Sequence, residues 1–200
     1  MYELITLFFV VLLFIRNFAK KNKTVYSEIL DVKTPVLTLN KQRIVRLGDF
    51  LIPPSYQQFS FELGYGRLLE LFFTYIPMGE SNYTNTLEEQ NAYLKSIFQS
   101  YLTNPAPPKL LHDPVNYRLI ANAEPFLFGE NGEVVFWDSE HPTADGECPI
   151  YLACFPIGIY FVGNNFSEFI ETLTHPTSFK NILKYYNEAL PPTFEPLEIE

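Results

Sequence analysis

The sequence predicts a single α+β domain, in which helices flank a curved, mixed and mostly antiparallel sheet. Strand patterns cluster between helical patterns, which favours this class over a doubly wound parallel sheet. The 200 residues suffice for one well-buried core, and a hydrophobic fraction of 47% is typical of a folded chain. We expect an apolar helix and basic connector over residues 1–34, the folded domain over 35–190, and a loose acidic tail over 191–200.

The chain begins with an apolar run, Leu4–Ile15, whose only polar residue is Thr6. As a helix it would span about 18 Å, whereas a bilayer core needs about 30 Å. Positive residues follow the run, at Arg16 and Lys20, and this order favours a cytoplasmic protein body. Three interpretations stay open for this segment: an anchor in which residues 4–15 tether the protein to the inner membrane face, a helix packed on the domain, or sequence outside the native fold.

The next elements are expected to alternate between helix and strand. A weak helical pattern covers 35–48, and a stronger one covers 51–66. Pro53 and Pro54 suit the start of the second helix, because a helix's first residues need no N–H partner. Residues 67–76 read RLLELFFTYI, an apolar run between Gly66 and Pro77 that predicts one buried strand.

A capping box and a hairpin signal mark the middle of the chain. Thr86, followed three residues later by Glu89, predicts the start of a helix with an apolar stripe. Strands are predicted over 117–128 and 133–137. The Asn131–Gly132 pair between them is a strong hairpin turn signal.

The last third predicts two short strands and two helices. The strands are expected over 149–155 and 157–162. Asn165 can cap a helix over 166–173, whose apolar residues recur at helical spacing. A final helix is expected over 178–190.

The charge is unevenly distributed and bears on the choice of partner. Residues 1–50 hold eight Lys/Arg and four Asp/Glu, whereas residues 51–200 hold six Lys/Arg and 19 Asp/Glu. Such an acidic body repels phosphate backbones, so we expect no nucleic-acid binding. It suits a basic protein partner, or it serves solubility alone. The two cysteines do not form a disulfide framework, and we expect reduced thiols of a cytoplasmic protein.

Motifs of catalysis are missing from the sequence. It has neither a phosphate-binding glycine loop nor a nucleophile elbow, so we expect no enzyme and no cofactor. Four residues of one predicted polar stretch could be drawn as a metal site, but their irregular spacing favours a solvated loop and no metal. These residues are Asp138, His141, Asp145 and Cys148.

Four sequence blocks, in order, resemble those of the SUKH superfamily, and together they cover roughly residues 36–175. The first is Ile52–Phe59, with Gly64-Tyr65-Gly66 and an apolar strand after it. The second is Pro125–Gly132, followed by VVFWD. The third is Pro149-Ile150-Tyr151, and the fourth runs from Gly163 to Leu173.

This resemblance implies an α+β fold and a role in binding rather than catalysis. Bacterial members of the superfamily bind and neutralise a toxin, often a nuclease, encoded beside them. The fungal members regulate cell-wall synthesis, so the alternative implied function is an intracellular scaffold or regulatory domain. The matched residues are expected to form core and turns and carry over no catalytic or ligand-binding role.

A binding face is therefore sought in the acidic loops around the predicted hairpin and the following loop. We expect these carboxylates to be exposed and to contact basic groups of a protein toxin, although solvated loop charges would look the same in sequence. The residues are Glu130, Glu133, Glu140, Asp145 and Glu147.

Overall fold

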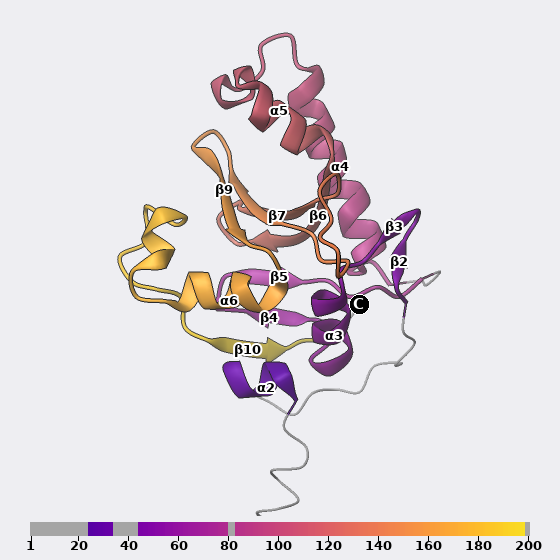
Figure 1. Ribbon diagram of the computed structural model, residues 1–200, viewed down its shortest axis with the longest axis vertical. Helices are drawn as coiled ribbons and strands as arrows, with labels where there is room; N and C mark the ends of the chain where they lie inside the picture. Colours follow the sequence, from indigo (N-terminus) through magenta and orange to yellow (C-terminus); the bar gives the residue numbers. More distant parts are fainter. Residues whose placement is uncertain (1–23, 34–43, 80–82, 199–200) are drawn as a thin grey trace, which may run out of the picture.

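An eight-stranded sheet forms the centre of the protein. The computed structural model describes residues 24–33, 44–79 and 83–198. The strands run in the order β1-β10-β4-β5-β6-β7-β8-β9, and only β1 and β10 pair in parallel. Their direction turns progressively from β10 to β9, so the sheet is strongly twisted (Figure 1). The predicted α+β class with a mixed, mostly antiparallel sheet is confirmed.

Six consecutive strands of this sheet form an antiparallel meander, from β4 to β9. They are β4 (Gly66–Leu68), β5 (Phe72–Thr74), β6 (Ala123–Gly129), β7 (Val134–Asp138), β8 (Ile150–Cys154) and β9 (Gly158–Gly163). The sheet is completed by β10 (Thr193–Pro196) beside β4 and by β1 (Asp31–Val32) beside β10. A separate hairpin joins β2 (Arg46–Leu47) to β3 (Phe50–Leu51).

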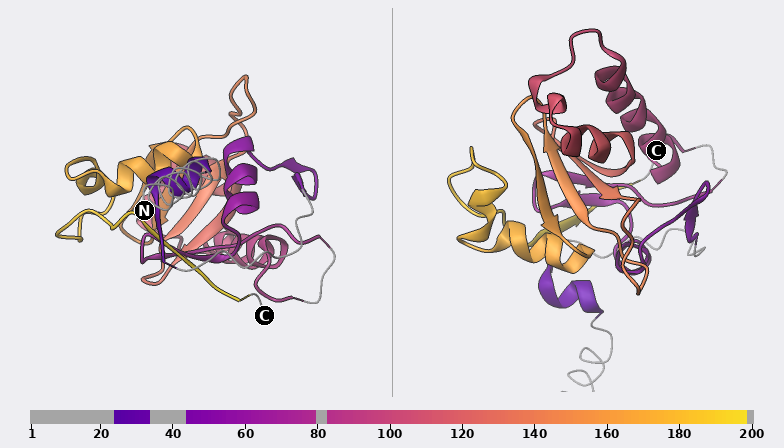
Figure 2. Two further views of the ribbon diagram at one scale, coloured as in Figure 1. Left: turned by 90° about the horizontal axis from the view of Figure 1, so that it is seen from below. Right: turned by 45° about the horizontal axis from the view of Figure 1, so that its top comes forward.

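Helices cover both faces of the sheet and bury two apolar clusters. The larger cluster lies beneath α2 (Val25–Ile29), α3 (Pro54–Glu62) and α6 (Phe166–Thr174). The smaller lies beneath α4 (Leu87–Thr103) and α5 (Pro114–Ala121), on the other face. Figure 2 shows α6 and the α4–α5 pair on either side of the strands. Two 3-10 helices, η1 (Lys109–His112) and η2 (Ser178–Asn181), lie in connections.

The elements with strong local signals form as predicted. Thr86 Oγ1 accepts a hydrogen bond from the Glu89 N–H at the start of α4, and Asn165 Oδ1 accepts one from the Glu168 N–H at the start of α6. The predicted helix after Pro53 is α3. The turn between β6 and β7 contains Gly132 at a φ of 91°, a conformation that glycine adopts without a steric cost.

Two predicted strands are wrong in part. Residues 67–76 do not form one strand but the β4–β5 hairpin, because Leu69 and Glu70 adopt φ values of 54° and 56° and reverse the chain. Residues 117–128 begin within α5 instead of a strand, and β6 starts only at Ala123. The missed signal is Asp113, whose carboxylate accepts the Val115 N–H and caps α5.

Two further predicted helices do not form in the residues that the structure describes. The C-terminal pattern over 178–190 yields only η2, and the chain then follows an irregular course to β10. Of the weak pattern over 35–48, residues 35–43 lie outside the described residues, and Arg46–Leu47 form β2. In the described residues of both stretches, tertiary contacts override a weak local propensity.

The described parts of both terminal segments are packed into the fold. Phe194 of β10 is completely buried, and β10 lies between β1 and β4, so the described part of the tail contains an internal strand and is not a loose segment. The described part of the connector forms α2 and β1, with Tyr26 buried against Phe59. The apolar run Leu4–Ile15 lies outside the described residues. Among the helices of the described residues, none has both the length and the apolar character needed to cross a membrane.

Candidate functional site

The five carboxylates expected to form one binding face lie in two separate groups. Glu130 and Glu133 belong to the β6–β7 turn, whereas the other three belong to the loop over 139–147 at the opposite end of β7. Strands rise about 3.3 Å per residue, so β7 holds the two groups about 13 Å apart along its length. The structure therefore does not bring the five carboxylates together in one cluster.

Two of the exposed carboxylates are engaged in ion pairs with arginines. Glu130 Oε2 accepts a hydrogen bond from Arg67 Nη2 at 2.9 Å, and Arg67 Nε lies 2.8 Å from Glu130 Oε1. Glu140 Oε2 lies 3.1 Å from Arg118 Nη1. Exposed pairs of this kind typically contribute at most about 1 kcal/mol to stability, so a partner could compete for them.

Glu147 and Asp145 order the loop before β8. Glu147 accepts the Ser55 N–H and hydroxyl, both at 2.7 Å, and Ser55 Oγ accepts the Phe166 N–H at 3.0 Å. Partial burial raises the pKa of Glu147. Asp145 accepts a hydrogen bond from the Thr143 hydroxyl, which lowers the pKa of this exposed carboxyl. The half-buried Glu147 thus joins the loop before β8 to the start of α3, and it is not a free surface charge.

Glu133 is buried, contrary to the prediction that it is exposed, with 3% of its surface accessible. Its Oε1 accepts the Tyr186 hydroxyl at 2.9 Å, and its Oε2 accepts the Asn131 N–H at 3.2 Å. The Tyr186 oxygen in turn accepts an Asn131 Nδ2 hydrogen at 2.7 Å. Among the described residues, no Lys or Arg forms an ion pair with this carboxylate.

The Glu133 side chain lines a pocket of about 440 Å³, which we name the Glu133 pocket. Its walls come from the β6–β7 turn, the β8–β9 turn and the segment after η2. Figure 1 shows this last segment extending past the sheet on the side of β9. The pocket is lined by Asn131, Glu133, Cys154, Ile157, Tyr160, Ile182, Leu183, Lys184, Tyr185 and Tyr186.

Three tyrosines and a lysine set the chemistry of the Glu133 pocket. Tyr185 is 75% exposed, whereas burial raises the pKa of the half-buried Tyr186 to about 12. Lys184 Nζ lies 4.8 Å from the centroid of the Tyr160 ring, a distance at which a cation is attracted to the ring face. Cys154 is a free thiol, and its pKa is raised by burial and then by Glu133, so it is not activated as a nucleophile.

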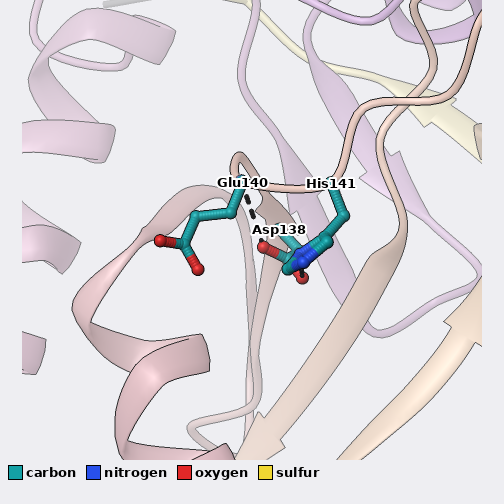
Figure 3. Close-up of side chains that lie close together, drawn as sticks. All are labelled: Asp138, Glu140 and His141. Carbon is teal, nitrogen blue, oxygen red and sulfur yellow. Dashed lines mark hydrogen bonds and ion pairs between the residues drawn. The ribbon is translucent and has the colours of Figure 1, made fainter.

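A second cluster gathers at the end of β7 (Figure 3). The His141 ring lies against buried Asp138, with 2.9 Å between Nδ1 and Oδ2, and the Glu140 N–H donates to Asp138 Oδ1 at 3.2 Å. The three side chains could offer a metal ion one ligand atom each. However, Arg118 Nη1 contacts Glu140 and lies 3.3 and 3.4 Å from the two His141 ring nitrogens. A guanidinium on two of the three ligands opposes a second cation there.

Comparisons with models of protein families, with curated proteins and with solved structures find no match to this chain. The candidate functional site is therefore supported only by the geometry of the described residues. Sequence reasoning selected Glu133 but missed the residues around it, because Tyr186 is 53 residues away and lay in a predicted helix. No local sequence pattern marks the three consecutive residues Lys184, Tyr185 and Tyr186 as part of a site, apart from the high aromatic content of the chain.

Proposed function

We propose that this protein is a non-catalytic, immunity-type protein that binds and neutralises a basic protein toxin in the cytoplasm. Its charge balance carries the proposal. Residues 51–200 hold 19 Asp/Glu against six Lys/Arg, and three of those six cations already pair with carboxylates of the chain. A surface with this surplus attracts a basic partner and speeds the encounter with it.

The resemblance to the SUKH superfamily supports the same function. The matched aromatic residues Tyr56, Phe59 and Phe166 pack against one another in the larger core cluster. The matched Gly129 and Asn131 belong to the β6–β7 turn beside the Glu133 pocket. The motif that resembles the superfamily thus builds one wall of the candidate site.

Neutralisation would take place by occlusion, since binding across a toxin's active-site rim excludes its substrate. The exposed carboxylates Glu130 and Glu140 can exchange their internal arginines for basic groups of the toxin at little cost. The Glu133 pocket supplies a recessed point of contact, where desolvated interactions contribute most to affinity.

Co-expression with the protein encoded next to this chain tests the proposal. The full chain should raise the number of surviving cells and should co-purify with its neighbour. Association should also slow steeply as salt is increased, because the attraction is electrostatic. A neighbour that is harmless, or that still kills cells containing abundant folded chain, would contradict the proposal for that pair and favour an intracellular scaffold.

A further inference from the structure

The buried carboxylate of Glu133 has hydrogen bonds, but no Lys or Arg of the described part of the chain forms an ion pair with it. Burying a carboxylate is costly unless a cation pairs with it, and buried acids are rarely left without one. The Tyr186 hydroxyl and the Asn131 N–H occupy one acceptor position on each oxygen. A carboxylate has about four such positions, so both oxygens can accept further hydrogen bonds.

One aromatic ring of the same pocket already attracts a cation. Lys184, whose side chain is exposed, places its ammonium over Tyr160, and Tyr185 and Tyr186 line the same pocket. Tyrosine faces combined with an acidic group form the kind of site that holds ammonium and guanidinium groups in other proteins. The Lys184 ammonium contacts the Tyr160 ring and forms no ion pair with Glu133.

We propose that the Glu133 pocket binds the guanidinium of an arginine side chain that projects from the partner protein. A guanidinium is planar and donates two parallel hydrogen bonds to a carboxylate, while its faces stack on aromatic rings. Both features are offered together here, by Glu133 and the tyrosines. A lysine ammonium would use the charge but neither the parallel donors nor the stacking. This partner assignment rests on the proposed function, whereas guanidinium binding does not.

Gly129 helps to aim the carboxylate. A Cβ atom added to Gly129 would collide with Oε2 of Glu133, so only glycine lets the Glu133 side chain fold back across the turn. Tyr186 then fixes Oε1 from the other side. The carboxylate is thus held in position before a ligand arrives, which lowers the entropic cost of binding.

The probe for this site is N-acetyl-arginine amide, titrated into the ¹⁵N-labelled full chain and followed by NMR. The neutral isostere N-acetyl-citrulline amide is the matched ligand control. We expect the arginine probe to shift the amides of Asn131, Ile157 and residues 182–186, and the citrulline probe to leave them in place. Equal shifts with both probes, or no shift with arginine, would overturn the proposal.

Variants test which charged groups of the Glu133 pocket are responsible for binding the arginine probe. Glu133→Gln should weaken arginine-probe binding about ten-fold or more, because a charge-assisted pair is lost. Glu188→Gln, a neutralisation at an exposed position of the segment after η2 that does not line the pocket, should change it less than two-fold. Lys184→Met removes a competing cation at an exposed position and should tighten binding about two- to three-fold. Unchanged affinity in Glu133→Gln, or weaker binding in Lys184→Met, counts against the assignment.

The same variants separate this inference from the proposed function. If the neighbour-encoded protein co-purifies equally well with wild type and Glu133→Gln, the immunity function stands and the arginine anchor fails. If the probe binds as described but the neighbour never co-purifies or is never neutralised, the guanidinium site stands and the proposed function fails for that pair.

Discussion

Replacing Phe194 with alanine is expected to lower the free energy of unfolding by about 3–5 kcal/mol. The ring is completely buried, and its centroid lies 5.5 Å from that of Phe59 in an edge-to-face arrangement. A buried phenylalanine removes about 200 Å² of surface from water, which at ~25 cal/mol per Å² amounts to an upper value of about 5 kcal/mol. Measured costs of such truncations fall in the same range, about 3–5 kcal/mol.

Urea denaturation followed by the fluorescence of Trp137, the one tryptophan of the chain, measures this loss. The probe is suitable because Trp137 is fully buried and stacks on Phe126. Glu198→Ala is the control in the same segment, because the exposed Glu198 should change stability by less than about 0.5 kcal/mol. A loss below about 1 kcal/mol in Phe194→Ala would refute the internal position of β10 and would favour a loose tail.

Three further perturbations test other parts of the structure. Asn165→Ala removes the cap of α6 and should cost about 1 kcal/mol in the same denaturation assay. Gly132→Ala forces a side chain onto a φ of 91° and should cost about 1–2 kcal/mol, measured likewise. Burial raises the pKa of Glu147 above 4.5, so the folded state binds its proton more tightly and stability should fall as pH rises through the window just above 4.5. Glu147→Gln should remove this component, and an identical pH profile in the variant would contradict it.

The parts of the fold that the sequence predicts are those decided within a few residues. The Thr86 and Asn165 caps act over three residues, and the Asn131–Gly132 turn is set by glycine's access to positive φ. The split of 67–76 into two strands could not be predicted from the sequence, because Leu69 and Glu70 adopt positive φ values and neither is a glycine or an asparagine. Their conformation is supported by the long-range contact of the Leu69 N–H with the Thr193 carbonyl, which no local pattern contains.

The C-terminal strand β10 was also not predicted, because a long-range contact and not its local sequence decides its structure. Proline and acidic residues over 191–200 are typical of a loose tail, but β10 fits between two strands because Gly66 lets its backbone approach closely. A Cβ atom on Gly66 would collide with the Glu195 carbonyl and the Phe194 ring. The two halves of this contact lie more than a hundred residues apart, so composition alone indicates neither.

Glu133 is a second residue whose environment the sequence does not predict, and its burial also bears on function. A charge next to an Asn–Gly turn is normally solvated, and the sequence offers no reason to expect otherwise. The structure buries it, although a buried carboxylate without a cation lowers stability. Residues that lower stability are often kept because they serve a function. If Glu133 serves binding, neutralising it as glutamine should weaken the partner complex while leaving the unfolding free energy the same or higher. If it serves only the fold, the same variant should lose stability and leave partner affinity unchanged, so one substitution distinguishes the two roles.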